Sequence, residues 1–132
     1  MTDSPEAAGA YAVGWPQIDA LHVECDLRLV ALAAADNATL ADALVLLLDH
    51  LVEHFGAEEA LMQSSGYPRF DCHKREHDAV LRVVERVRPM CEAGDHLTAR
   101  RLAAEFPQWF DAHANSMDAQ LAAWLRGQVA AT

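Results

Sequence analysis

Four segments of the chain repeat apolar residues every three or four positions, which is the period of an α-helix and the strongest constraint on the fold. Short breaks rich in polar residues, glycine or proline separate them at residues 35–37, 64–68 and 92–94. No stretch of useful length alternates polar and apolar residues as a strand would. The pattern predicts an all-α, up-down-up-down antiparallel four-helix bundle over residues 15–132, preceded by an irregular N-terminal arm over residues 1–14.

The predicted helices have recognisable ends. Thr39 and Asp95 stand where the second and fourth helices should begin, and we expect them to cap these helices. Gly66 should end the second helix, and Pro89 should fray or end the third helix slightly early. Pro107 lies inside the fourth pattern, so we expect either a kink or a short helix followed by a longer one.

Composition excludes several classes of protein. The 132 residues suffice for one domain with a substantial core. The formal net charge of −10 disfavours nucleic acid as a partner, because phosphate binding needs a basic surface. The three cysteines are an odd number without C-x-x-C spacing, which argues against a disulfide framework. The sequence shows no signal peptide and no long apolar run. We therefore expect a cytoplasmic monomer that does not insert into membranes.

Histidines and a glutamate occupy the apolar faces of the predicted helices, where a core should avoid them unless they have a partner. The residues on these faces are His22, His54, Glu58, His73, His77 and His113. His54 and Glu58 are four residues apart, as are His73 and His77, so each pair shares one helix face. A single helical histidine is usually a hydrogen-bonded core or surface residue. Histidines on all four helices instead indicate a site in the bundle interior.

The fourth helix offers His113 and Asp118, which are five residues apart. At ~100° per residue this step is roughly 140° out of alignment, so a shared site needs a local distortion or a different side-chain reach. Five imidazoles and two carboxylates without a thiolate exceed what one structural zinc ion needs. Bridging carboxylates, with the imidazoles divided three and two, favour iron. The Glu-x-x-His ligation of ferritin-like proteins does not occur in the sequence.

These residues resemble the haemerythrin family, specifically its single-domain bacterial members, over roughly residues 15 to 125. The matching residues, in the family's order and spacing, are Trp15, Ile18, Asp19, His22, His54, Phe55, Glu58, Glu59, Met62, Tyr67, Pro68, His73, His77, Trp109, Phe110, His113 and Asp118. The resemblance implies the same bundle fold and two non-haem iron ions per chain.

The resemblance also implies a set of metal ligands. These are His22, His54, Glu58, His73, His77, His113 and Asp118. His73, His77 and His113 would hold one iron, and the other two histidines would hold the second. The two carboxylates would bridge the irons together with an oxo or hydroxo group from solvent. The second iron would then keep an open position, at which haemerythrins bind dioxygen reversibly.

The sequence departs from the family pattern near the implied site. Leu21 stands where many bacterial relatives have glutamine, and His50 stands where they often have tyrosine. We interpret His50 as an outer histidine beside the site or on the surface, or alternatively as a proton donor. Ala114 replaces a bulky aliphatic residue. We expect Ala114, Phe55 and Met62 to line the dioxygen pocket, which the small alanine would widen unless one of the other two fills the space.

The implied function is that of a dioxygen carrier, store or scavenger and not of an enzyme. One alternative is a di-iron peroxidase, oxidase or nitric-oxide-handling enzyme that uses the same site. Others are an oxygen or redox sensor, and a bundle with only a structural role. The sequence does not indicate which reductase or acceptor protein would serve as the partner.

Overall fold

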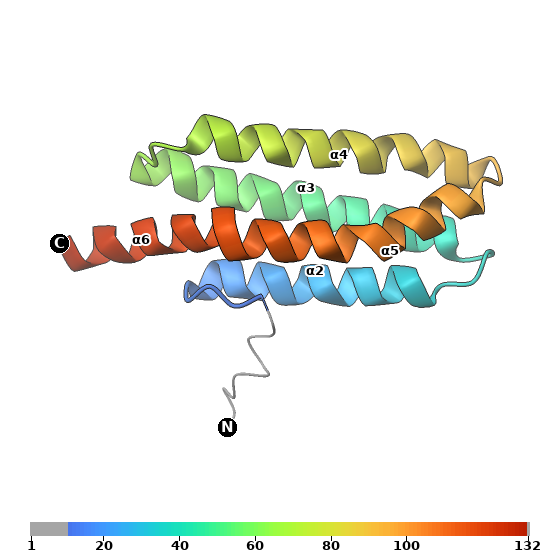
Figure 1. The fold of residues 1–132 in the computed structure, drawn as a ribbon, viewed down its shortest axis with the longest axis horizontal. Helices are drawn as coiled ribbons and strands as arrows, with labels where there is room; N and C mark the ends of the chain where they lie inside the picture. Colours follow the sequence, from blue (N-terminus) through green and yellow to red (C-terminus); the bar gives the residue numbers. More distant parts are fainter. Residues whose placement is uncertain (1–10, 132) are drawn as a thin grey trace, which may run out of the picture.

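A computed structural model of the protein describes residues 11–131, which form a bundle of antiparallel helices (Figure 1). The elements are α2 (Pro16–Ala34), α3 (Leu40–Ser65), α4 (Phe70–Glu92), α5 (His96–His113), η1 (Ala114–Asp118) and α6 (Ala119–Ala131). The last three follow one another without a break and together form the fourth helix of the bundle. No strand occurs among the described residues, and the predicted all-α four-helix fold is confirmed. Residues 1–10 of the predicted arm and residue 132 lie outside the described range.

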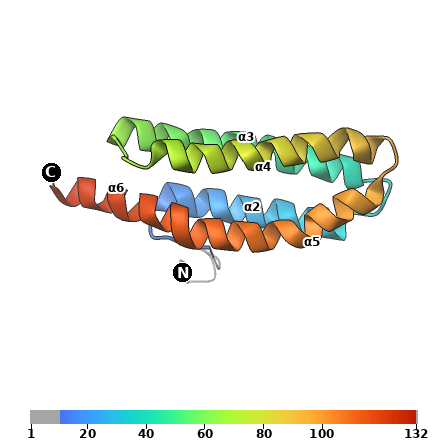
Figure 2. The same cartoon turned by 45° about the horizontal axis from the view of Figure 1, so that its top comes forward.

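Neighbours in sequence are neighbours in space. α2 packs against α3, α3 against α4 and α4 against α5, and α5 closes the ring by packing against α2 (Figures 1 and 2). The short connections between helices impose this antiparallel order. No helix within residues 11–131 combines the length and apolarity needed to cross a bilayer.

The helix ends agree with the predictions at two of three positions. Gly66 follows α3 with a φ of 69°, in the left-handed region that glycine tolerates best. The Asp95 carboxylate accepts a hydrogen bond of 3.1 Å from the Thr98 N–H and so caps α5. Thr39 occupies the predicted N-cap position of α3, but its side chain makes no capping hydrogen bond. Instead Asp36 Oδ1 accepts hydrogen bonds from the Thr39 N–H and hydroxyl, each 2.9 Å long.

Pro89 and Pro107 both lie in the interior of helices. α4 continues past Pro89 to Glu92, so the expectation of an early end was wrong. A proline removes one intrahelical hydrogen bond, and the buried Val87 and Cys91 on either side hold the helix in place. α5 likewise runs unbroken through Pro107 to His113, which excludes a short helix ending there. The α5 ribbon bends along its length, as the kink alternative requires (Figure 2).

Two apolar clusters fill the bundle on either side of its middle. The larger one is built from α2, α3, α4, α5 and the first residue of η1, and it contains Leu47, Phe55, Phe110 and Ala114. The smaller one, towards the start of α2 and the end of α3, contains Ile18, Met62, Tyr67, Leu121 and Leu125. Each fully buried leucine or phenylalanine contributes about 1.5–3 kcal/mol. This apolar burial allows the bundle to hold the polar side chains that lie between the clusters.

Candidate metal centre

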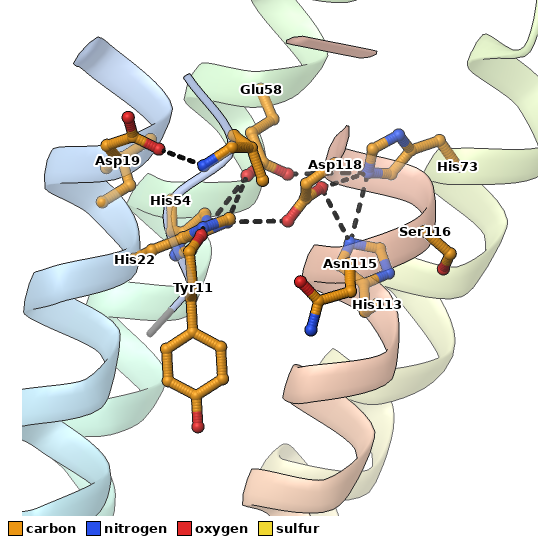
Figure 3. Close-up of polar contacts among 12 residues, drawn as sticks. Tyr11, Asp19, His22, His54, Glu58, His73, His113, Asn115, Ser116 and Asp118 are labelled. Atoms are coloured by element: carbon orange, nitrogen blue, oxygen red, sulfur yellow. Dashed lines mark hydrogen bonds and ion pairs between the residues drawn. The ribbon is translucent and has the colours of Figure 1, made fainter. Parts of the chain in front are cut away.

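Seven histidine and carboxylate side chains meet in the middle of the bundle. They are His22 from α2, His54 and Glu58 from α3, His73 and His77 from α4, His113 from α5 and Asp118 from η1. None is more than 2% exposed. In Figure 3, Glu58 and Asp118 lie between His22 and His54 on one side and His73 and His113 on the other. The structure therefore brings together every residue that the sequence analysis proposed as a ligand.

The four-residue spacing aims two pairs of side chains at the same point. His54 Nε2 lies 2.9 Å from Glu58 Oε2 on the same helix. His73 and His77, one turn apart on α4, have ring centroids 4.5 Å apart. Residues four apart on a helix lie on one face, and here that face is turned into the bundle.

A π-helical turn lets His113 and Asp118 face the same point although they are five residues apart. The Ala119 N–H donates to the Ala114 carbonyl five residues earlier, which is the π-helical pattern. The wider turn brings Asp118 Oδ1 to 3.1 Å from His113 Nε2. Of the two predicted alternatives, a local distortion and a different side-chain reach, the structure shows the local distortion. Asn115 Nδ2 and the Ser116 hydroxyl donate to main-chain carbonyls of the preceding turn, at 2.9 and 2.6 Å, and so satisfy acceptors that the altered winding disturbs.

The seven side chains divide into two donor groups. One consists of Glu58, His73, His77, His113 and Asp118, and the other of His22, His54, Glu58 and Asp118. Within each group, one ligand atom from every residue lies within 4.8 Å of all the others. Glu58 and Asp118 belong to both groups. The arrangement can therefore hold two cations side by side, with the two carboxylates shared between them.

Two buried carboxylate oxygens show that protein groups alone do not satisfy this cluster. Glu58 Oε1 and Asp118 Oδ1 have no hydrogen-bond partner among the described residues. Asp118 Oδ1 lies 2.9 Å from His73 Nε2 and 3.1 Å from His113 Nε2, but without the geometry of a hydrogen bond. His73 Nε2 and His113 Nε2 are themselves only 3.2 Å apart. Nitrogen and oxygen lone pairs that converge in this way fit a cation placed among them.

The charges in the cluster depend strongly on one another. Burial opposes protonation of His22, but the Asp118 carboxylate at 2.7 Å and the Glu58 carboxylate at 3.7 Å outweigh it and raise the pKa of His22 to about 10. The carboxylates of Asp118 and Glu58 likewise outweigh burial at His73 and raise its pKa to about 9. Burial also opposes the charged form of Glu58, yet the surrounding imidazoles hold its pKa well below the usual value. Without a cation, protons on the imidazoles thus balance the buried carboxylates.

Four of the five histidines use Nδ1 to contact an outer partner, which fixes the ring and leaves Nε2 facing the cluster. His22 Nδ1 lies 2.7 Å from the Tyr11 carbonyl, and His54 Nδ1 lies 3.1 Å from His50 Nε2. His50 is 8% exposed and therefore buried beside the site. Burial, with His54 beside it, lowers the pKa of His50 to about 4.

Two glutamates supply the remaining outer contacts. His77 Nδ1 lies 3.0 Å from Glu59 Oε2, and His113 Nδ1 lies 2.7 Å from Glu76 Oε1. From the sequence, neither glutamate had been identified as the partner of a histidine. Glu59 follows Glu58 directly, and this pair of acids was the available signal. Glu76 stands in a charged stretch of α4, where nothing distinguished it from its neighbours.

The expected pocket residues lie in different surroundings. Phe55 stacks on His77, with centroids 4.0 Å apart and an interplanar angle of 6°. Ala114 belongs to the same apolar cluster as Phe55, whereas Met62 belongs to the smaller cluster. The ring edge-on to His22, at 5.2 Å, is that of Phe110. Phe110 appeared in the sequence analysis only as a family match and is an additional apolar neighbour of the two-histidine group.

The fold and the centre define a class of protein, namely a helical bundle with a buried histidine and carboxylate site for cations. The family model described as "Hemerythrin HHE cation binding domain" matches residues 15–125. The chain belongs to the haemerythrin family.

Curated relatives agree with this assignment. A Bacteriohemerythrin from Ralstonia nicotianae is 36% identical over 88% of this chain and 85% of its own length. A Bacteriohemerythrin from Pseudomonas aeruginosa is 30% identical over 64% of this chain and 54% of its own length. One from Methylococcus capsulatus is 35% identical over 48% of this chain and 48% of its own length. The last two alignments thus span about half of those relatives. No solved structure matches the chain significantly.

Proposed function

We propose that the chain binds two iron ions and uses them to bind dioxygen reversibly as a carrier, store or scavenger. His73, His77 and His113 would hold one iron, and His22 and His54 the other, with Glu58 and Asp118 bridging them together with an oxo or hydroxo group from solvent. The observation that carries the proposal is the unequal division of imidazoles, three and two, around two shared carboxylates. An ion held by two histidines would have fewer protein ligands and so would keep a position for a small molecule. Iron, when bound, supplies the reversible electron transfer that dioxygen binding requires.

The side chains of this protein contribute orientation and exclusion of water. All seven ligands are buried, and the larger apolar cluster covers one side of the centre. A dry interior limits the entry of protons that would make the reaction irreversible. Glu59 and Glu76 are placed to accept the Nδ1–H of His77 and His113, which keeps each Nε2 lone pair directed inward.

The decisive experiment follows the absorption spectrum of anaerobically reduced, iron-loaded protein as air is admitted and then removed. We expect a charge-transfer band that appears with oxygen, disappears under vacuum and returns over repeated cycles. Metal analysis of the same sample should give two irons per chain. Catalytic turnover of peroxide, with no reversible band, would overturn the carrier function and support the enzyme alternative. A protein that takes up only zinc or no metal would refute the proposal entirely.

A second prediction concerns the small residue in the π turn. Ala114 is fully buried beside the centre, and we propose that its lack of bulk widens the pocket and admits water. Ala114→Ile should therefore slow the irreversible passage of the air-exposed protein to the ferric state, measured as decay of the oxygen-dependent band. The matched control is Ala99→Ile. Ala99 is also fully buried in the fourth helix of the bundle, but it lies near the start of α5, far from the centre. An unchanged rate in Ala114→Ile would mean that a neighbour such as Phe55 already fills the space.

A further inference from the structure

A second group of metal-binding side chains lies beside the centre, between α2 and α3. It consists of Cys25, His50 and His54, whose ligand atoms all lie within 4.8 Å of one another. Cys25 is fully buried, His50 is 8% exposed and His54 is 1% exposed. Cys25 is a free thiol. Of this donor set, Cys25 and His50 are used neither by the family match nor by the proposed iron cluster, whereas His54 belongs to both groups.

The geometry of the two histidines suits a shared ion. His50 Nε2 and His54 Nδ1 face each other at 3.1 Å. Ring nitrogens bound to one ion at about 2.0–2.1 Å and near-tetrahedral angles are separated by similar distances. The Leu21 carbonyl oxygen lies 3.2 Å from the same His50 nitrogen and is a further donor at this place. The position therefore offers sulfur, two nitrogens and an oxygen within a small volume.

An acidic groove provides a route to this position. It has a volume of about 560 Å³, and His50 and Leu21 form part of its lining. Three carboxylates, those of Glu24, Asp49 and Glu53, line it together with one guanidinium, that of Arg28. Arg28 is already engaged, because its Nε lies 2.8 Å from Glu24 Oε2. The surplus of negative charge raises the local concentration of cations near His50.

From these observations we propose that Cys25, His50 and His54 form an additional site for a soft or borderline d¹⁰ cation, Zn²⁺ or Cu⁺, which enters through the groove between α2 and α3. Thiolate with imidazole is the ligand combination that such ions prefer over harder cations. On binding, the S–H bond of Cys25 breaks and a sulfur–metal bond forms. Where iron already holds His54 Nε2, the Nδ1–H bond of His54 also breaks as its nitrogen–metal bond forms, and the protons released leave to water in the groove. No electron is transferred.

The site shares a residue with the proposed iron cluster. His54 directs Nδ1 towards His50 and Nε2 towards Glu58 Oε2, at 3.1 and 2.9 Å. An ion at the additional site would therefore contact the same imidazole as the iron, on the opposite side of the ring. This last point rests on the proposed function, whereas the additional site itself does not.

The test adds Co²⁺, as a coloured substitute for Zn²⁺, and separately Cu⁺ to iron-loaded protein that is kept reduced without air. Thiolate ligation should produce a sulfur-to-metal charge-transfer band in the near ultraviolet that saturates at one equivalent per chain. Cys25→Ser should abolish the band, and His50→Phe should weaken binding by at least about tenfold, as loss of a direct or supporting ligand does. A response to Co²⁺ alone would indicate a site for Zn²⁺, and a response to Cu⁺ alone a site for Cu⁺.

Two controls make the result specific. Cys91→Ser changes another buried thiol, and Cys72→Ser changes an exposed one, and both should keep the band. Circular dichroism must show that Cys25→Ser is folded. Absence of a sulfur band in the unaltered protein, or its persistence in folded Cys25→Ser, would overturn the proposal. Because the band needs sulfur and the iron cluster contains none, failure here is distinguishable from failure of iron binding.

Discussion

Replacing Glu58 by alanine is expected to empty both metal positions. Glu58 is the glutamate common to both donor groups, and it is fully buried with Oε1 lacking a hydrogen-bond partner. Loss of a direct ligand typically weakens binding by more than the 10–100-fold caused by loss of an outer contact. Iron retained after gel filtration should therefore fall below about a tenth of the unaltered level. Metal analysis together with the oxygen-dependent absorption band measures this.

The control for Glu58→Ala is Glu85→Ala, which removes an exposed glutamate from α4 and should keep full iron content. We expect Glu58→Ala to remain helical because the apolar clusters on either side are unchanged. Far-UV circular dichroism must show this. If folded Glu58→Ala retained both irons, the bridging role of this carboxylate would be excluded.

Removal of the metal is expected to destabilise the protein more strongly as the pH rises. In the metal-free protein, His22 and His73 have pKa values of about 10 and 9, above the value of about 6.5 in an unfolded chain. The folded state then binds the extra protons, so this contribution to stability is complete below about pH 6.5 and is lost as the pH rises through 9 to 10. Metal binding has the opposite dependence, because it requires deprotonated imidazoles.

The measurement compares unfolding of iron-loaded and stripped protein at about pH 6, 7.5 and 9. With free metal a thousandfold above the dissociation constant, one bound ion contributes about 4 kcal/mol, or roughly 10–20 °C in the unfolding midpoint. This difference should be smallest at the lowest pH and should grow towards the highest. His96→Ala, which changes a histidine outside the cluster, should leave the trend unaltered. A difference that is constant or shrinks with rising pH would contradict the charge balance described for the centre.

Helical periodicity and side-chain type could indicate from the sequence that buried histidines and Glu58 form a site, whereas the full set of ligands, including Asp118, came from the resemblance to the haemerythrin family. His54 with Glu58, and His73 with His77, had to share a face once the helices were assigned, and an apolar stripe had to face the interior. The five-residue step to Asp118 indicated that either the backbone deviates there or the two side chains differ in reach. These inferences need only local geometry and the rule that buried charge requires a partner.

The outer contacts could not be predicted in the same way. Glu76 reaches His113 on a different helix, so its role depends on how α4 and α5 are rotated against each other. Tyr11 reaches His22 through its main-chain carbonyl, which leaves no mark in the side-chain pattern. Pro89 was misjudged for a related reason. Packing of a helix against its neighbours outweighs one lost hydrogen bond near its end.

The π-helical turn η1 affects the direction in which residues point along the whole fourth helix of the bundle. Each residue added to or removed from a helix rotates everything beyond it by about 100°. By accommodating one residue more than an α-turn, η1 lets Asp118 face the centre while Leu121 and Leu125 of α6 still face the smaller apolar cluster. A single π-helical turn thus allows both the ligand Asp118 and the apolar residues of α6 to face the interior, although their spacings from His113 do not fit one regular α-helix. This fourth helix of the bundle can accordingly change length by one residue only outside the two clusters, beyond Leu125 or in the connection before His96.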